Sequence, residues 1–290
     1  MIQAGREEIM HKFKDCVAVV TGAGSGIGRQ LAYQLADAGA QLAISDIVAN
    51  NLQETLQEVK RRGARVEATV LDVADQAAVY NYATSVEQQF GKINLVINNA
   101  GVALSSGPLW TTSIEDFKWL MDINFYGVLY GTKAFLPILE KASWGHIVNV
   151  SSIFGIIAVP NQTAYNASKF AVRGLTEALR QELKIAGSAV SCTSVHPGGI
   201  KTNIANFARW VDSGESNAAE QHSSALADFD KLARTSPESA AAQILKAVIN
   251  NKRRLLIGND AKFVDLIQRL MPTSYAWFIS KWLGDTPNKI

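Results

Sequence analysis

Thr21-Gly-Ala-Gly-Ser-Gly-Ile-Gly28 decides the fold, because this stretch connects a strand pattern to a helix pattern. The apolar run Val17-Ala-Val-Val20 precedes it and is typical of a buried strand. A helical pattern with Leu31 and Leu35 on one face follows, and Gly39 is expected to end that helix. Glycines let the backbone turn tightly beside a ligand, and a helix start presents free N–H groups to an anion. The stretch therefore predicts a phosphate-binding turn.

The spacing of these glycines differs from the usual dinucleotide fingerprint, since Gly22, Gly26 and Gly28 give G-x-x-x-G-x-G. A glycine turn between a strand and a helix can also be purely structural. The loop by itself therefore leaves dinucleotide binding open.

An acidic residue ends the next strand pattern, 40–45. Asp46 lies on the order of 20 residues past the glycine loop, where a carboxylate can hydrogen-bond the adenosine ribose hydroxyls. The same carboxylate would repel a 2′-phosphate, and neither Ser25 nor Ile47 supplies a cation for one. Asp46 could instead be an ordinary turn residue, but its position relative to the loop favours a cofactor role. The prediction is NAD(H) rather than NADP(H).

Two further strand patterns, 66–71 and 93–97, end abruptly in small or polar residues. Ligands bind at the carboxyl ends of strands in an open parallel sheet. Asp72, which precedes Val73, could accept a hydrogen bond from an adenine amino group. The run Asn98-Asn-Ala-Gly101 could line the cofactor site or only tie neighbouring strands together.

Strand and helix patterns alternate along the chain, which predicts an α/β fold with a doubly wound parallel sheet of about seven strands and helices on both faces. The chain has 290 residues, of which 48% are hydrophobic, enough to bury a large core in one domain. Helices are expected in the gaps, including 115–139 and 165–185. The expected strands lie near 17–20, 40–45, 66–71, 93–97, 146–150, 189–195 and 254–257.

Tyr165 and Lys169 lie one helical turn apart, and Ser152 lies thirteen residues upstream of the tyrosine. Residues four apart share a helix face, so the ammonium is expected to lower the pKa of the Tyr165 phenol. Such a phenol can give a proton to a carbonyl oxygen or take one from an alcohol. A serine hydroxyl can hydrogen-bond the same oxygen. Taken alone, the pair could also be an exposed aromatic beside a solvated lysine.

Together these motifs resemble the short-chain dehydrogenase/reductase family, in its single-domain branch, over about residues 14–258. The resemblance implies a Rossmann-like fold, nicotinamide-dependent oxidoreduction and a homodimer or homotetramer. The motifs that carry it are Thr21 to Gly28, Asp46, Asp72, Asn98 to Gly101, Asn124, Ser152, Tyr165 with Lys169, and Pro197-Gly198 with Thr202.

The resemblance also implies roles for four catalytic residues. Asn124 is similar to the helix asparagine that holds a water in the proton relay, and Ser152 to the hydroxyl that steadies the substrate oxygen. Tyr165 resembles the proton donor and acceptor. Lys169 resembles the residue that contacts the nicotinamide ribose and lowers the pKa of the tyrosine. Ser152 is preferred to Ser151 because its distance from Tyr165 along the chain matches the family.

The cofactor implied is NAD, with NADP disfavoured by Asp46. The segment 197–202 resembles the one that seats the nicotinamide amide and exposes one face of the ring. The predicted cofactor-binding set is Gly22, Ser25, Gly26, Ile27, Gly28, Asp46, Asp72, Val73, Asn99, Ala100, Gly101, Tyr165, Lys169, Pro197, Gly198, Ile200 and Thr202.

Composition argues against several other classes of protein. The net charge is +2, and no basic run is interleaved with aromatics, so nucleic acid is not an expected partner. Cys16 and Cys192 are expected to be reduced core residues of a cytoplasmic protein. The histidines show no ligand spacing, and no metal site is predicted. Each is expected at the surface or at a strand end: His11, His146, His196 and His222.

The substrate side is less distinctive. The segment 153–160 is almost wholly apolar, and 203–236 is a long irregular stretch of the kind that often forms a lid. With Phe207, Trp210 and Trp110, these segments predict a hydrophobic pocket for a lipophilic alcohol or carbonyl compound. The same residues could instead be ordinary core beside the sheet. Ser236 before Pro237 is expected to cap the next helix.

The tail repeats apolar residues at helical spacing, which predicts two short amphipathic helices. The aromatic second helix is compatible with peripheral membrane contact. We prefer the alternative that the tail covers the protein's own pocket or a partner subunit. The apolar repeat of the first helix is Phe263, Leu266, Ile267 and Leu270; that of the second, with Trp277 and Lys281 alongside, is Tyr275, Phe278, Ile279 and Trp282.

The predicted organisation is an N-terminal extension (1–13), a catalytic domain (14–258) containing the lid, and a C-terminal helical extension (259–290). No signal peptide is expected in the opening residues, and no run approaches the roughly 20 apolar residues of a membrane span. The leading hypothesis is an NAD(H)-dependent oxidoreductase that interconverts an alcohol and a ketone or aldehyde. The alternatives are a fatty aldehyde or acyl-thioester reductase and a catalytically inert dinucleotide-binding scaffold or sensor.

Overall fold

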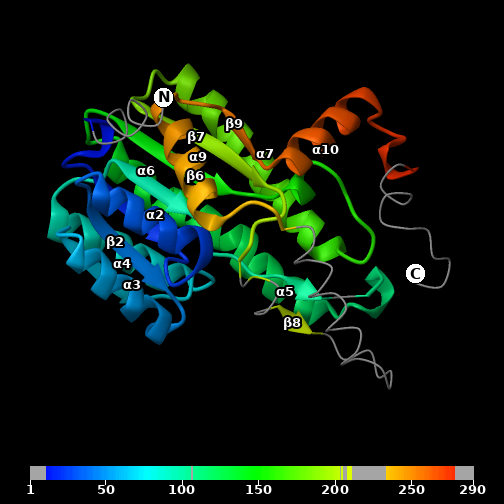
Figure 1. The fold of residues 1–290 in the computed structure, drawn as a ribbon, viewed down its shortest axis with the longest axis horizontal. Helices are drawn as coiled ribbons and strands as arrows, with labels where there is room; N and C mark the ends of the chain where they lie inside the picture. Colours follow the sequence, from blue (N-terminus) through cyan, green and yellow to red (C-terminus); the bar gives the residue numbers. More distant parts are fainter. Residues whose placement is uncertain (1–10, 106, 203, 205–207, 211–232, 278–290) are drawn as a thin grey trace.

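A seven-stranded, wholly parallel sheet forms the centre of the protein (Figure 1). This computed structural model describes residues 11–105, 107–202, 204, 208–210 and 233–277. The strand order is β3-β2-β1-β4-β6-β7-β9, which confirms the predicted doubly wound sheet. The strands are β1 (Val17–Thr21), β2 (Gln41–Asp46), β3 (Val66–Val70), β4 (Leu95–Asn98), β6 (Gly145–Val150), β7 (Val190–Pro197) and β9 (Arg254–Ile257).

Helices cover both faces of the sheet because side chains of each buried strand alternate between two core clusters. In β1, Ala18 and Val20 belong to one cluster, whereas Val17 and Val19 belong to the other. The first cluster includes side chains from α2 (Gly26–Asp37), α3 (Ala49–Arg61) and α9 (Pro237–Ile249). The second includes side chains from α4 (Gln76–Phe90), α6 (Gly127–Leu139) and α7 (Thr163–Ile185).

The helix predicted at 115–139 is interrupted. It consists of α5 (Ile114–Met121), a π-helical turn (Asp122–Tyr126) and α6. The side chain of Ser113 caps its start by accepting a hydrogen bond from the Asp116 amide. Pattern reasoning missed the interruption, because a π-turn adds one residue without breaking the apolar face. The described residues also form two 3₁₀ turns, at Leu109–Thr111 and Ile153–Gly155. A separate two-stranded parallel sheet consists of β5 (Leu104–Ser105) and β8 (Arg209–Trp210).

The first tail helix, α10 (Asn259–Leu270), forms as predicted. Ala261 and Val264 are buried, while Phe263, Leu266 and Leu270 are exposed. Asp265 is also buried, and it forms ion pairs with Arg254 and Arg269. None of the described helices is long and apolar enough to span a bilayer.

Several expectations fall outside the described residues. Most of the predicted lid, including Phe207, lies there, and nothing can be said of the Trp210 side chain. In the second tail helix, Tyr275 and Trp277 stand in a short helical stretch. The remaining predicted positions, Phe278, Ile279, Lys281 and Trp282, lie beyond the described residues.

Candidate active site

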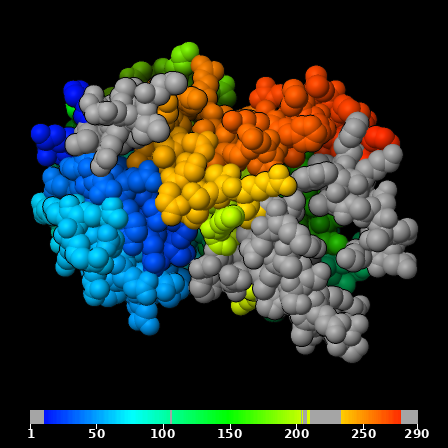
Figure 2. Space-filling view, in the orientation of Figure 1, coloured from blue at the N-terminus to red at the C-terminus, as the bar shows by residue number. Residues whose placement is uncertain are grey.

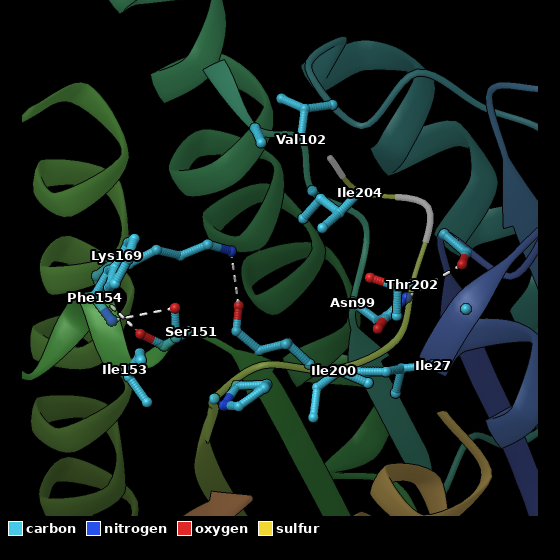
Figure 3. A pocket seen from close by; sticks show the side chains of 18 of the residues that line it. Ile27, Asn99, Val102, Ser151, Ile153, Phe154, Lys169, Ile200, Thr202 and Ile204 are labelled. Carbon is cyan, nitrogen blue, oxygen red and sulfur yellow. Dashed lines mark hydrogen bonds between the residues drawn. The ribbon is translucent and has the colours of Figure 1, made fainter. Parts of the chain in front are cut away.

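A cavity of about 1420 Å³ lies along the carboxyl ends of the strands. Typical small-molecule pockets measure about 300–1,000 Å³, so this one has room for a dinucleotide and a second molecule. It is lined by every predicted cofactor residue except Gly28, and by every predicted catalytic residue except Asn124. In Figure 3, Ile27, Asn99 and Thr202 lie on one side of it, and Lys169, Ser151 and Phe154 on the other.

The glycine loop packs so closely that side chains are excluded at its turn. Gly22 has a φ of +64°, and a Cβ there would lie 2.8 Å from the Ala100 Cα. Gly26 has a φ of +51° and faces Thr202. Ser25, at the start of α2, makes no side-chain capping hydrogen bond. The backbone N–H groups at the start of α2 therefore meet the cavity without a side chain capping them, which suits a phosphate.

Gly28 was predicted to contact the cofactor, but it does not line the cavity. A Cβ at this position would lie well inside 3.0 Å of the Gly22 carbonyl oxygen and of the Asn99 amide nitrogen. Glycine is therefore required so that α2 can approach the end of β1 closely. Its role is helix–strand packing behind the loop.

Asp46 both fastens the glycine loop and lines the cavity. Its carboxylate accepts hydrogen bonds from the amides of Gly24 (2.8 Å) and Val48 (2.9 Å). The nearby Arg29 guanidinium donates to the carbonyl oxygens of Gly24 and Asn51, and it pairs with a glutamate. Among the described cavity residues at the end of β2, none is a lysine or arginine. This end of the cavity is therefore unsuited to an additional phosphate.

Two asparagines stand at the end of β4, and each takes one of the two roles considered above, tying strands together or lining the cofactor site. Asn98 is buried and donates to the Asn149 side chain (2.8 Å), which ties β4 to β6. Asn99 donates to the carbonyl oxygens of Thr21 (3.0 Å) and Gly22 (3.2 Å), and it also lines the cavity. Asn98 is thus a structural residue, whereas Asn99 shapes the glycine loop from the cavity side.

Tyr165 and Lys169 share one face of α7, as the spacing predicts, and the Lys169 Nζ lies 5.4 Å from the Tyr165 ring centroid. The ammonium also donates to the Val150 carbonyl oxygen (3.2 Å), a contact visible in Figure 3. Burial raises the pKa of Tyr165 to about 12, and a hydrogen bond with Ser152 only partly opposes this. Burial also lowers the pKa of Lys169 to about 8. The predicted fall in the tyrosine pKa was therefore wrong for the free protein, because burial is the dominant influence on that pKa.

The two adjacent serines after β6 have different surroundings. The Ser151 hydroxyl is buried and donates to the Lys169 carbonyl oxygen (2.8 Å), so its proton is committed to α7. The Ser152 hydroxyl accepts from the Phe154 amide (3.2 Å) and hydrogen-bonds the Tyr165 side chain. The choice of Ser152 as the hydroxyl that meets a substrate fits this geometry.

Asn124 lies in the π-helical turn, fully buried behind the cavity wall. Its side chain accepts from the Val102 amide (2.8 Å) and donates to the Val102 carbonyl oxygen (2.9 Å). These bonds position Val102, which lines the cavity. A role for Asn124 in holding a relay water stays a prediction.

His196 is fully buried near the end of β7, which fits the expected strand-end position, but sequence reasoning missed its contact with Ser152. Its Nδ1 lies 2.9 Å from the Ser152 carbonyl oxygen, and its Nε2 lies 2.9 Å from the Ser194 Oγ. Because a carbonyl can only accept, Nδ1 carries the proton and Ser194 donates to Nε2. Burial lowers the His196 pKa to about 4. A neutral imidazole thus holds the backbone of Ser152. The position of His196 directly before Pro197-Gly198 was the sequence feature that could have indicated this role.

His146 is a second buried histidine, and its place at the start of β6 fits the expected strand-end position. It is buried within β6, its Nε2 lies 2.8 Å from the Thr193 hydroxyl, and burial lowers its pKa to about 3. Cys16 and Cys192 are buried free thiols, as expected for core residues. Among the described residues no three His, Cys, Asp or Glu side chains gather as metal ligands would.

The far end of the cavity is apolar. The side chain of Phe154 meets the Tyr165 ring edge-on at 5.9 Å, and Ile153, Ile157 and Val159 continue the wall after it. These residues confirm that the segment 153–160 faces the cavity. Trp110, in contrast, was placed wrongly: it is 80% exposed and does not line the cavity.

The tail helix contributes further apolar residues to this wall, in agreement with the expectation that the tail covers the protein's own pocket. Phe263 and Val264 line the cavity from α10. The Ala158 amide donates to the Tyr275 hydroxyl (3.1 Å), which ties the residues after α10 to the segment 153–160. The apolar wall of the cavity is therefore built jointly by the residues after β6 and by the tail.

Comparison with known proteins was made for the sequence and for the fold. The family model described as short chain dehydrogenase matches residues 16–210. The putative oxidoreductase SadH of Mycobacterium tuberculosis is 46% identical over 267 residues, covering 92% of this chain and 94% of that protein. Estradiol 17-beta-dehydrogenase 11 of Rattus norvegicus is 27% identical over 259 residues, covering 89% and 80%.

Among solved structures, a short-chain dehydrogenase/reductase from Burkholderia phymatum in complex with NAD superposes with a TM-score of 0.81. It is 30% identical in sequence, and the match covers 89% of this chain and 94% of that one. The same fold therefore accommodates NAD in that protein.

Proposed function

The chain belongs to the short-chain dehydrogenase family of oxidoreductases, and on that premise we propose that it is an NAD(H)-dependent enzyme interconverting an alcohol and a ketone or aldehyde. One observation carries the proposal: Ser152, Tyr165 and Lys169 line the same cavity as the glycine loop. A hydroxyl and a phenol stand at one end of that cavity, and phosphate-binding backbone at the other. A scaffold that only bound a dinucleotide would not need a phenol beside a serine hydroxyl and an ammonium there.

The cavity fits NAD better than NADP. Free N–H groups at the start of α2 suit the pyrophosphate, and the room left by Gly22 and Gly26 suits its close approach. The Asp46 carboxylate can accept from the ribose hydroxyls and repels a 2′-phosphate. The Burkholderia phymatum relative, which binds NAD, supports the same choice.

When bound, NAD(H) supplies or accepts the hydride, and the protein manages the accompanying proton. Tyr165 gives that proton to a carbonyl oxygen or takes it from an alcohol, while the Ser152 hydroxyl hydrogen-bonds the same oxygen. Lys169 stabilises the ionised phenol as charge develops. Because burial holds the pKa of Tyr165 near 12 in the free protein, this stabilisation is needed at the moment of transfer rather than before it.

We assign a lipophilic substrate to the apolar end of the cavity. Phe154, Ile157 and Val159 on one wall and Phe263 and Val264 on the other offer hydrocarbon contacts next to Tyr165. The estradiol dehydrogenase relative, whose name denotes a steroid alcohol, is consistent with this class.

A spectrophotometric screen at 340 nm tests the proposal. Alcohols and ketones of increasing chain length are assayed with NAD(H) and with NADP(H). We expect turnover with NAD(H) that rises with the length of the apolar part. Release of thiol from acyl-CoA substrates would instead indicate an acyl-thioester reductase, and cofactor binding without turnover of any substrate would indicate a scaffold.

A further inference from the structure

A carboxylate on the tail helix α10 hydrogen-bonds the backbone just after β7. Asp260, in the first turn of α10, accepts a hydrogen bond from the Gly199 amide with its Oδ2 (2.7 Å). The adjacent Gly198 amide donates to the Ile257 carbonyl oxygen (2.9 Å). The segment proposed to seat the nicotinamide is thus tied to residues that lie beyond the matched family region, 16–210.

The carboxylate occupies space that two glycines leave for it. A Cβ at Gly198 or at Gly258 would lie well inside 3.0 Å of an Asp260 oxygen. Gly258 also needs glycine for its φ of +99°, but Gly198 is outside the left-handed region. At Gly198 the three atoms nearest to an added Cβ all belong to the Asp260 carboxylate, so this carboxylate accounts for the demand for glycine.

The opposite edge of the same segment is held by backbone. The Lys201 amide donates to the Thr235 carbonyl oxygen (2.9 Å), and the Thr235 amide donates to the Gly199 carbonyl oxygen (3.3 Å). Gly198, Gly199 and Asp260 all line the cavity. Figure 3 shows Ile200, Thr202 and Ile204 along this segment, across the cavity from Lys169. The segment is thus held on one edge by the Asp260 side chain and on the other edge by backbone hydrogen bonds with Thr235.

We propose that Asp260 is a positioning residue, which fixes the segment 197–199 so that the nicotinamide end of the dinucleotide is held at the depth that Tyr165 requires. This proposal rests on the proposed function. The same helix carries Phe263 and Val264 into the substrate end of the cavity. Asp260 therefore fixes the position of the segment 197–199 relative to the apolar residues that α10 contributes to the cavity.

The chemistry of the contact suits this task. A hydrogen bond to an ionised acceptor is roughly twice as strong as a neutral one. Asp260 also lies in the first turn of a 12-residue helix, where a negative side chain is favoured. In Figure 2, orange to red atoms, which include those of α10, lie along the upper right edge of the molecule. Because Asp260 joins α10 to the cavity wall, we expect movement of α10 to be transmitted to the nicotinamide seat.

Isothermal titration calorimetry with NADH and ADP-ribose separates a positioning role from a purely structural one. ADP-ribose lacks the nicotinamide, so its binding does not depend on the seat. We expect Asp260→Ala to weaken NADH about tenfold, the effect of losing one charge-assisted hydrogen bond. ADP-ribose affinity should stay within about twofold of wild type. Asp260→Asn, which keeps the shape and one acceptor oxygen, should recover most of the NADH affinity.

Gly198→Ala provides an independent test that keeps the carboxylate. Its methyl group would displace Asp260 from the Gly199 amide, so we expect the same selective loss of NADH affinity. The double variant Gly198→Ala/Asp260→Ala should be no weaker than either single one, since all three remove one contact. Asp265→Asn is the matched control: Asp265 lies on the same helix and pairs with arginines, but it does not line the cavity. It should lower the melting temperature without changing the ratio of the two affinities.

Each contrary outcome has a distinct meaning. Equal weakening of NADH and ADP-ribose in Asp260→Ala and Gly198→Ala would overturn the positioning role and leave a structural one. Unchanged NADH affinity in both variants would also overturn it, while the proposed function would stand. Wild-type protein that binds neither ligand would overturn the proposed function together with this inference.

Discussion

The two ends of the cavity are built by different means. At the cofactor end, backbone packs on backbone: Gly22 and Gly28 approach their neighbours too closely for any side chain. At the substrate end, side chains such as Phe154 and Phe263 form the wall, and α10 leaves large apolar residues exposed. Because of this difference, the cofactor end tolerates almost no change in shape, whereas the shape of the substrate end depends on which side chains line it. The experiments below are ordered by the size of the expected effect.

The largest effect is expected at the junction of the two ends. Tyr165→Phe removes the proton donor and keeps the ring that packs on Phe154. We expect turnover to fall by about 10³-fold or more, because general acid–base catalysis contributes up to about 10⁴-fold. NADH affinity should be unchanged by calorimetry. Turnover within tenfold of wild type would exclude this phenol as the proton donor.

The rigidity of the cofactor end is tested by Gly28→Ala. The added methyl group would collide with the Gly22 carbonyl oxygen, so we expect the free energy of unfolding to fall by about 3 kcal/mol or more. Gly174→Ala is the matched control, since it lies in α7 with no atom within 4 Å of the added Cβ. It should stabilise the protein by about 0.5–1 kcal/mol in urea unfolding. Equal effects of the two variants would refute the packing role of Gly28.

Much of the cofactor end could be predicted from the sequence, because its determinants are local. A strand, a glycine turn and a helix stand side by side in the chain, and Asp46 follows the next strand. The strand boundaries were therefore correct within about two residues. Gly28 was assigned to the cofactor rather than to packing, since a motif names a glycine without saying which atoms surround it.

The substrate end was predicted less well, because its contacts join distant parts of the chain. The tail pattern does not show that Asp265 is buried beside arginines, or that Asp260 accepts a hydrogen bond from the Gly199 amide. The burial of His196 beneath Ser152 depends on the pairing of β6 with β7. The pKa of Tyr165 could not be anticipated either, since the pattern shows the cation but not the depth of burial.

The buried histidines predict a specific acid sensitivity. Burial holds the pKa of His196 near 4 and that of His146 near 3, both below the ordinary 6.5. The unfolded chain therefore binds more protons as the pH falls below about 6.5, so stability decreases with acidification. We expect each histidine to cost up to about 1.4 kcal/mol per pH unit between pH 6.5 and 5.

Urea unfolding at pH 7 and pH 5 measures this loss. In His196→Asn the amide can still donate to the Ser152 carbonyl oxygen but does not titrate, so the pH dependence should become shallower. An unchanged slope would show that His196 is not the group responsible.

A smaller effect is expected on cofactor choice. Asp46→Asn keeps the acceptor for the Gly24 amide but removes the charge, so the preference for NAD over NADP in kcat/KM should fall about tenfold. Asp72→Asn, at the neighbouring strand end, is the control and should leave that ratio within about twofold. If Asp72→Asn lowered the preference for NAD more than Asp46→Asn does, the charge that discriminates against NADP would be that of Asp72 rather than that of Asp46.

The smallest effect is expected at the adaptable end. Phe263→Ala removes apolar surface from the cavity wall, so KM for long-chain substrates should rise about fivefold while short ones are little affected. Trp110→Ala removes a larger apolar side chain that is exposed outside the cavity, and it should leave both values unchanged. Steady-state kinetics over a chain-length series compares the two. An equal response to both substitutions would remove Phe263 from the substrate wall.

The most direct measurement of the central claim is a crystal structure of the protein with NADH. We predict that the nicotinamide lies against the segment 197–199, with the Tyr165 hydroxyl about 3 Å from the position of a carbonyl oxygen placed for hydride transfer. A nicotinamide bound away from Tyr165, with Ser152 also out of reach, would contradict the assignment of proton transfer to this site.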